Sequence, residues 1–271
     1  PVLVGSGVAW PNGFRADVFA AALAAAVLIQ IGTNYANDRF DFTRGADRPE
    51  RLGPPRLAAL GLATERELAS ATAIAFGLAA LVGLYLVALG GVPILLVGLA
   101  SIAAGLAYTA GPYPLGYHGL GDLFVFVFFG LVPLPAMEYL HTGTVTALAF
   151  VAAIPVGCVV TAIVVVNNLR DIDEDRSVAK RTFAVVLGRT GTRVWYSVLL
   201  VIAYAALPVA WALDLVPATA LLPALTAPLA IRLGEIVSHR EGAPLNEALR
   251  GTGQLHLLFG ALLAIGLVVR A

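Results

Sequence analysis

Residues 68–121 read LASATAIAFGLAALVGLYLVALGGVPILLVGLASIAAGLAYTAGPYPLGYHGLG and contain no Asp, Glu, Lys or Arg. A membrane-spanning helix needs about 20 mostly apolar residues, so this stretch is long enough for two spans with a turn at Gly90-Gly91. Glu138 is the only charged residue between 123 and 169, and Asp214 is the only one between 195 and 231. A soluble domain of this size could not bury so much uncharged sequence in one core. The chain is therefore predicted to be an integral membrane protein.

The overall composition supports the same conclusion. Of the 271 residues, 59% are hydrophobic and only 13% are charged, whereas soluble domains carry roughly 25% charged residues. The formal net charge is zero, and the basic residues form no stripe with interleaved aromatics, so a nucleic-acid partner is not indicated. The single cysteine, Cys158, lies in an apolar segment and is expected to be a small buried hydrophobic residue.

Helices are the expected elements, because a chain in lipid must satisfy its own backbone hydrogen bonds and the alternating pattern of barrel strands is absent. We predict an all-α fold in one transmembrane domain over residues 1–271. Residues 1–10 are expected to form a shortened first span, because the chain opens at Pro1 without Met. The nine predicted spans lie near 1–10, 15–36, 67–89, 92–109, 121–139, 144–168, 194–212, 217–232 and 252–270.

The distribution of basic residues predicts the orientation of these spans. Fifteen of the 17 Lys and Arg residues fall in the segments 39–66, 170–193 and 232–250, which all lie on one side. Only Arg15 and Arg270 fall on the other side. By the positive-inside rule the Arg-rich side is cytoplasmic. We therefore predict a multi-pass protein of the cell membrane.

Two acidic motifs occur on that same side, each headed by amides at the end of a span. The first is Gln30-x3-Asn34-x2-Asn37-Asp38-x2-Asp41-x5-Asp47, and the second is Asn167-Asn168-x2-Asp171-x3-Asp175. Steps of three and four residues place the Asn and Asp side chains of each motif on one helix face. Acidic groups at membrane depth are costly, so they normally face a cavity or a partner.

Carboxylates that converge from two helices need compensating positive charge. Magnesium binds oxygen ligands, often one or two carboxylates together with substrate phosphates. Arg and Lys can hold phosphate oxygens directly, and Arg44, Arg170, Lys180 and Arg181 lie in the same segments. The pattern therefore predicts a magnesium-diphosphate site at the cytoplasmic side. The alternative is ordinary charge patterning on a solvated loop, which is the expectation for Asp173 and Glu174, since they point away from the Asp171–Asp175 face.

The two motifs also carry a family resemblance. NDRFDFTRGADRPERLGPPR (37–56) and NNLRDIDEDRSVAKRTFAVVLG (167–188) resemble the two Asp-rich motifs of the UbiA-type intramembrane prenyltransferases. RLGPPR (51–56), YTAGPYPLGYHGLGDLFVFVFFG (108–130) and KRTFAVVLG (180–188) most resemble the branch of menaquinone biosynthesis that prenylates 1,4-dihydroxy-2-naphthoate. One position departs from the superfamily pattern, in which the third Asp often comes four residues after the second. Here Gly45 stands there, and the acid follows at Asp47.

The resemblance implies nine helices around a central cavity and a Mg2+-dependent reaction. A polyprenyl group would pass from polyprenyl diphosphate to 1,4-dihydroxy-2-naphthoate, with decarboxylation to a demethylmenaquinol. The lipid bilayer would surround the apolar tunnel for the prenyl chain. The expected metal ligands are Asp38, Asp41, Asp47, Asp171 and Asp175, and all of these except Asp47 are also expected to be catalytic.

Other residues are expected to bind the substrates. The 110–122 loop contains no Lys or Arg, so it forms a neutral polar cap in which Tyr117 and Asp122 would orient the phenolic acceptor. His118 is expected to accept a phenolic proton near neutral pH. The remaining predicted substrate-binding residues are Asn34, Asn37, Arg44, Asn168, Arg170, Lys180 and Arg181.

Four other classes of protein are alternatives to this hypothesis. A transporter could place polar residues at span ends, but its substrate site would lie near the bilayer midplane. A CDP-alcohol transferase would show an Asp-Gly-x2-Ala-Arg string, which this chain lacks. A soluble prenyl-elongating enzyme is excluded by the charge-free stretches. Relatives that use other acceptors, such as 4-hydroxybenzoate or homogentisate, remain the nearest alternatives.

Overall fold

The computed structural model describes residues 1–46 and 52–269, and within these ranges the regular structure is entirely helical. The predicted all-α fold is thus confirmed. The η labels mark 3-10 turns, except η3, which is a π-helix. In chain order the elements are α1 (Val2–Ala9), η1 (Trp10–Asn12), α2 (Ala16–Thr43), α3 (Glu65–Ala107), η2 (Leu115–Tyr117), α4 (Gly121–Phe126), η3 (Val127–Leu131), α5 (Pro133–Thr142), α6 (Ala147–Arg170), α7 (Ile172–Ser177), α8 (Phe183–Ala212), η4 (Ala218–Thr226), α9 (Ala227–His239) and α10 (Leu245–Val268).

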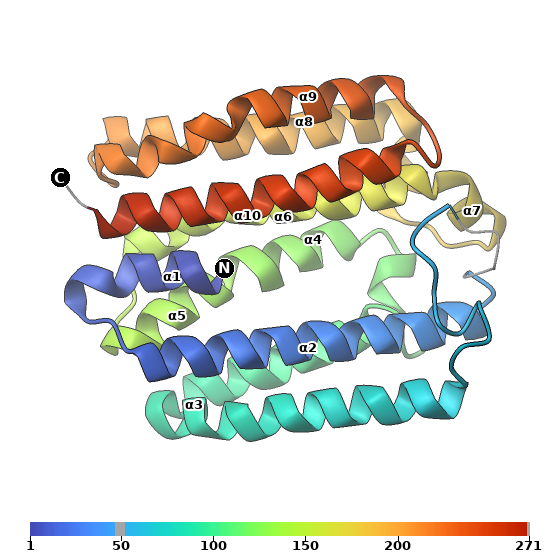
Figure 1. Cartoon of the computed structure of the whole chain (residues 1–271), viewed down its shortest axis with the longest axis horizontal. Helices are drawn as coiled ribbons and strands as arrows, with labels where there is room; N and C mark the ends of the chain where they lie inside the picture. Colours follow the sequence, from blue (N-terminus) through green and yellow to red (C-terminus); the bar gives the residue numbers. More distant parts are fainter. Residues whose placement is uncertain (47–51, 270–271) are drawn as a thin grey trace.

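Seven helical segments of the described chain are long and apolar enough to cross a membrane. They are α2, α3, the α4–α5 segment, α6, α8, the η4–α9 segment and α10. The α3 segment contains two helices that meet at Gly91, where φ is 65° and ψ is −153°. Glycine adopts this backbone conformation at little steric cost. Figure 1 shows α3 running away from the α7 end and returning, so the two predicted spans 67–89 and 92–109 are antiparallel.

With α3 divided at Gly91 and α1 added, the described residues give the nine helices predicted from the sequence. At eight residues, α1 is too short to cross a bilayer. Four boundaries differ from the prediction by seven residues or more. Helix α2 continues past residue 36 to Thr43, and α8 begins at Phe183 instead of 194. Helix α9 continues past residue 232 to His239, and α10 begins at Leu245 instead of 252.

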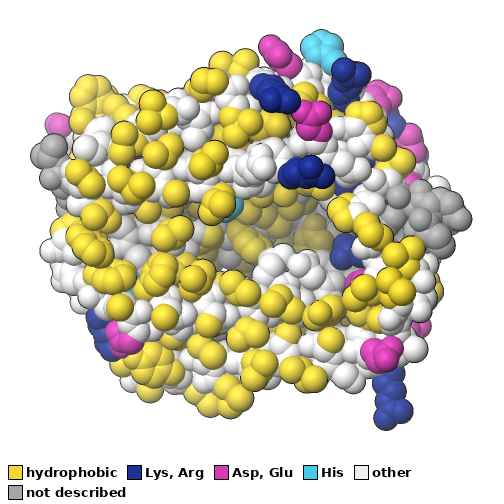
Figure 2. Space-filling model, in the orientation of Figure 1, with side chains coloured by type: hydrophobic (Ala, Val, Ile, Leu, Met, Phe, Trp, Pro, Cys, Tyr) yellow, Lys and Arg dark blue, Asp and Glu magenta, His cyan; other side chains and the backbone are white. Residues whose placement is uncertain are grey.

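The helices are arranged around a hollow. Figure 1 shows α2 and α3 along one side of the bundle, α6, α8, α9 and α10 along the other, and α4 and α5 between them. Figure 2 shows that the face between α2 and α10 is hollowed, with hydrophobic side chains lining the hollow. This hollow corresponds to the central cavity that the family resemblance implies.

Small residues allow the helices behind the hollow to approach closely. A Cβ atom at Gly130 would lie only 2.6 Å from the Cα atom of Gly157, so the backbones of η3 and α6 are in direct contact. Helix α6 is the most deeply buried span, and Cys158 is one of its buried apolar residues, as predicted. The core thus fixes α6, which carries the second acidic motif at its end.

The loops that carry the acidic motifs gather at one end of the bundle, which we call the α7 end. It comprises residues 37–46, 52–64, 108–122, 167–182 and 240–246, which lie together at the right of Figure 1. Segments far apart in the sequence therefore meet there.

Candidate active site

The first acidic motif lies on the last turns of α2. Because the helix continues to Thr43, Asp38 and Asp41 are one turn apart on the same face, and both are buried. The carboxylate of Asp38 accepts hydrogen bonds from the backbone N–H groups of Leu57 (2.9 Å) and Ala58 (3.2 Å). The segment that follows the first motif thus folds back over the end of α2.

The loop between α3 and α4 is fastened to the same helix end. The hydroxyl of Tyr117 donates to Oδ1 of Asp41 at 2.8 Å, and the hydroxyl of Thr109 donates to Oδ1 of Asn37 at 2.9 Å. The guanidinium of Arg44 donates to the carbonyl of Gly111 at 2.7 Å and also to that of Thr109. Side chains of the first motif therefore hold the 108–120 loop in place.

The second motif begins where α6 ends. Helix α6 stops at Arg170, and Asp171 forms the junction with α7. The buried guanidinium of Arg170 donates to both carboxylate oxygens of Asp171, through Nε and Nη2 at 2.6 Å each. It also donates to Oδ1 of Asn167 at 2.9 Å. This bidentate pair fixes the orientation of the Asp171 carboxylate and compensates its charge.

Asp175 is buried as well but is only partly compensated. Lys180 Nζ lies 3.4 Å from Oδ1 of Asp175, while Oδ2 has no hydrogen-bond partner in the described part of the chain. Burial raises the pKa of Asp175 to about 6. The neighbouring carboxylates of Asp171 and Asp41 also raise this pKa, whereas the positive charge of Lys180 lowers it. A buried carboxylate oxygen without a partner is costly unless a ligand satisfies it.

Lys180 and Tyr117 join the two motifs. Lys180 Nζ lies 5.2 Å from the centre of the Tyr117 ring, and the Tyr117 hydroxyl contacts Asp41. Burial lowers the pKa of Lys180, but the carboxylates of Asp41 and Asp175 together raise it above its ordinary value. Burial and the Asp41 carboxylate raise the pKa of Tyr117. The structure therefore brings the end of α2 and helix α7 close to the same lysine.

The remaining predicted site residues lie at varying distances from this centre. Asn34 is exposed one turn before Asp38, Asn168 is buried at the end of α6, and Arg181 has an exposed side chain. Asp47 lies outside the described residues. His118 lies on the surface of its loop, where it stacks on Tyr113 at 3.6 Å and its Nδ1 faces the carbonyl of Pro114 at 2.9 Å.

Asp122 is buried in the first turn of α4. Its Oδ2 accepts a hydrogen bond from Nε1 of Trp195 at 3.0 Å, and its Oδ1 has no hydrogen-bond partner within the described ranges. Tyr108 lies beside it, since a Cβ atom at Gly121 would be 2.9 Å from the Tyr108 hydroxyl. Asp122 therefore links the start of α4 to α8.

Sequence reasoning missed several residues of this end. Tyr108, Thr109 and Trp195 carry no charge, and Asn246 lies 76 residues from the arginine it contacts. A signal for Tyr108 and Thr109 did exist, because both belong to the string 108–130 that resembles the family. No comparable signal marked Asn246, which stands at the start of α10 like any helix-terminal amide.

The donor set fits magnesium. In the described residues, no group of three His, Cys, Asp or Glu side chains is gathered closely enough to hold a metal ion by itself. Magnesium normally keeps such an open arrangement, with one or two carboxylates and the rest of its shell from substrate phosphates and water. The unpartnered Oδ2 of Asp175 is a ready ligand. Asp38, Asp41 and Asp171 supply the other candidate oxygens.

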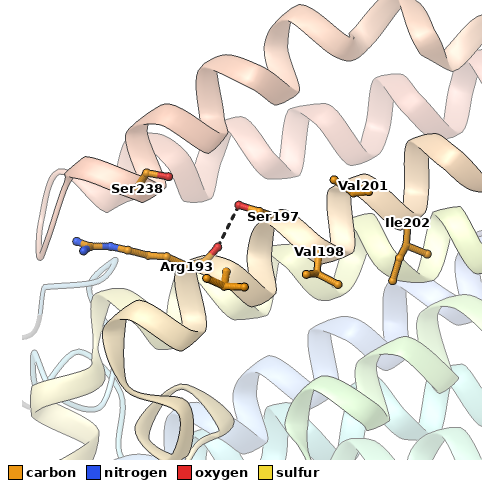
Figure 3. Close-up of a pocket in the computed structure, with 7 residues that line it drawn as sticks. Arg193, Ser197, Val198, Val201, Ile202 and Ser238 are labelled. Atoms are coloured by element: carbon orange, nitrogen blue, oxygen red, sulfur yellow. Dashed lines mark hydrogen bonds between the residues drawn. The ribbon is translucent and has the colours of Figure 1, made fainter.

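Two features lie apart from this centre. A groove between α8 and α9 is lined by Val194, Val198, Val201, Ile202 and three polar residues, and Figure 3 shows the lining along α8, with Ser238 contributed by α9. Its four apolar residues are exposed. It contains none of the acidic residues, so we do not assign the reaction to it. Asp173 is exposed and forms an ion pair with Arg189 at 2.5 Å, as expected for a solvated residue of the second motif.

The all-α membrane fold and the paired acidic motifs define the class of an intramembrane prenyltransferase. Residues 1–249 match the UbiA prenyltransferase family, and the chain belongs to this family. It is a multi-pass membrane protein. The 1,4-dihydroxy-2-naphthoate octaprenyltransferase of Mycobacterium tuberculosis is 39% identical over 98% of this chain and 90% of its own length.

Solved structures show the same fold. The apo structure of a UbiA homolog from Aeropyrum pernix K1 matches with a TM-score of 0.73 at 18% identity, over 97% of each chain. A UbiA homolog from Archaeoglobus fulgidus, bound to DMAPP and Mg2+, matches with a TM-score of 0.65 at 16% identity, over 99% of this chain and 93% of that one. At these identities the likeness concerns the fold.

Proposed function

We propose that this protein transfers a polyprenyl group from polyprenyl diphosphate to 1,4-dihydroxy-2-naphthoate, releasing diphosphate and carbon dioxide. The observation that carries the proposal is the meeting of Asp41 and Asp175, from α2 and α7, around Lys180. The Mycobacterium tuberculosis relative, whose name specifies this acceptor, supports the choice of substrate. The Arg-rich loops support a cytoplasmic position for the site.

Asp38, Asp41, Asp171 and Asp175 would hold Mg2+, as the Mg2+-bound Archaeoglobus homolog with the same fold suggests. Bound Mg2+ neutralises diphosphate charge and so favours its departure as a leaving group. Lys180 adds positive charge close to both motifs, and the hydroxyl of Tyr117 holds the Asp41 carboxylate in place. In this arrangement the diphosphate lies at the α7 end and its prenyl chain lies in the apolar hollow.

The transfer breaks the allylic C–O bond and forms a C–C bond to the naphthoate ring. The attacked ring carbon loses its carboxylate as carbon dioxide, and diphosphate leaves with the bonding electrons of the C–O bond. The hollow keeps water from the allylic carbon while that bond is broken. Asp122, buried at the start of α4, and His118, at the loop surface, are the candidates to orient the acceptor and to accept its phenolic proton, which returns to the oxygen as the quinol product forms.

The test is an assay of the purified protein with Mg2+, a polyprenyl diphosphate and equal amounts of 1,4-dihydroxy-2-naphthoate and 4-hydroxybenzoate. We expect prenylated, decarboxylated naphthoate product by mass spectrometry. Asp173→Ala is the matched control, since this exposed residue lies two positions from both Asp171 and Asp175 and should retain activity. Product from hydroxybenzoate alone would refute the proposed acceptor, and uptake of substrate by vesicles without any product would favour a transporter.

A further inference from the structure

One side chain of α10 connects the two halves of the α7 end. Oδ1 of Asn246 accepts a hydrogen bond from Nη1 of Arg170 at 2.8 Å. Nδ2 of Asn246 donates to the backbone carbonyl of Leu52 at 2.8 Å. Asn246 thus bridges the second acidic motif and the segment that follows the first motif, although it belongs to neither.

Both ends of this bridge lead directly to candidate metal ligands. Arg170 is fully buried and holds both oxygens of Asp171. The segment 52–58 holds both oxygens of Asp38, through the N–H groups of Leu57 and Ala58. A change at Asn246 therefore reaches Asp171 through one arginine and Asp38 through one short segment of backbone.

The surroundings make this bridge important for the position of the segment. A pocket of about 410 Å³ lies beside it, lined by Gly53, Pro54, Asn246, Leu249 and Arg250. The contact between the 52–54 backbone and α10 is therefore not tightly packed at this point. Where packing is loose, a hydrogen bond with defined geometry contributes more to the position of the backbone.

We propose that Asn246 is a positioning residue that couples the orientation of Asp171 to the placement of the 52–58 segment on Asp38. The inference rests on the proposed function, because it concerns how the same site is organised. Groups that hold metal ligands from behind typically change metal affinity by about 10–100-fold when they are removed. Asn246 holds two such groups at once.

The test compares the wild type with Asn246→Ala, Asn246→Asp and the neighbouring control Glu247→Ala. Glu247 is exposed and pairs with Arg232 at 2.8 Å, away from the motifs. The first measurement is the Mg2+ concentration that gives half-maximal turnover, together with the KM for each substrate. The second is hydrogen exchange of the peptide that contains residues 52–61, with and without Mg2+ and inorganic diphosphate.

Asn246 stands one contact behind those groups, so for Asn246→Ala we expect an apparent Mg2+ affinity weaker by up to about tenfold, faster exchange in the 52–61 peptide, and an unchanged KM for the aromatic acceptor. Asn246→Asp keeps an acceptor for Arg170 but loses the donor to Leu52. It should therefore speed exchange in this peptide while weakening Mg2+ less. If Asn246→Ala does not fold, Asn246→Asp carries the test through exchange alone. Glu247→Ala should match the wild type in both measurements.

Wild-type Mg2+ dependence and wild-type exchange in a folded Asn246 variant would overturn the coupling. Asp171→Ala separates this failure from failure of the proposed function. If Asp171→Ala is inactive while Asn246→Ala behaves like the wild type, only the coupling is wrong. If Asp171→Ala turns over normally, the proposed site itself is wrong.

Discussion

The titration of Asp175 gives a sharp test of the charge balance in the site. Burial raises the pKa of this carboxyl from 3.8 to about 6, with further contributions from Asp171 and Asp41. Because the folded-state pKa lies above the unfolded value, the folded protein holds the extra proton between about pH 4 and 6. Without metal, stability therefore falls as the pH rises through this window, and the loss is complete above about pH 7.

The magnitude follows from the size of the shift. A pKa difference of about two units corresponds to a loss of about 3 kcal/mol, which is an upper value for a group that relaxes on ionisation. Asp175→Asn removes this titration while keeping the shape of the side chain. In the presence of a chelator we therefore expect Asp175→Asn to be more stable than the wild type at pH 8. At that pH the apparent Tm should be several degrees higher, and about half of the difference should remain at pH 5, which lies in the middle of the window.

The assay is thermal unfolding of detergent-purified protein at pH 5, 6, 7 and 8, with a chelator. Asp173→Asn serves as the control, because this carboxylate is exposed and pairs with Arg189 at the surface. Adding Mg2+ and inorganic diphosphate at pH 8 should stabilise the wild type but not Asp175→Asn, since a bound ion replaces the proton. Parallel pH profiles of the wild type and Asp175→Asn would refute the reasoning that Asp175 is a buried carboxylate that Lys180 compensates only in part.

Further outcomes follow from the contacts of individual residues. Asp38→Ala and Asp171→Ala should each abolish measurable turnover while the protein still elutes as a folded species in detergent; activity near that of the wild type in either variant would remove that residue from the site. Tyr117→Phe loses the hydrogen bond to Asp41, which is worth about 1.5–3 kcal/mol for a charged acceptor. The kcat/KM for the diphosphate should therefore fall at least tenfold, and an unchanged kcat/KM would exclude a role for this contact. Arg44→Lys cannot reproduce both carbonyl contacts to the 108–120 loop, so hydrogen exchange of that loop should rise, whereas Arg240→Lys, at an exposed position of the same end, should leave it unchanged.

Much of the fold could be predicted from charge distribution alone. The stretch 68–121 has no charged residue, and the Gly90-Gly91 pair marks its break, so the two antiparallel spans of α3 were predictable. The end of α2 was harder to predict from the sequence. Polar residues at 37–43 resemble a loop when a span is judged by hydropathy, yet they continue the helix because their side chains face other parts of the protein.

The candidate site was predicted in its residue types but not in its connections. Spacing alone predicts that Asp38 and Asp41 share one helix face and that Asp171 and Asp175 are one turn apart. Spacing did not predict the position of Lys180. This residue was expected to hold phosphate, and in the structure it also lies close to both motifs. Arg170 was likewise expected to bind the diphosphate, but in the structure its guanidinium is occupied by Asp171, Asn167 and Asn246.

The central claim is that carboxylates from α2 and α7 share divalent ions with a diphosphate. Electron paramagnetic resonance of Mn2+, used in place of Mg2+, measures this directly in the wild type, Asp41→Ala, Asp175→Ala and the control Asp173→Ala. We expect the wild type to bind Mn2+ only when inorganic diphosphate is present. Asp41→Ala and Asp175→Ala should both lose this binding, and the control Asp173→Ala should keep it. Undiminished, diphosphate-dependent Mn2+ binding in either of these two variants would contradict the account.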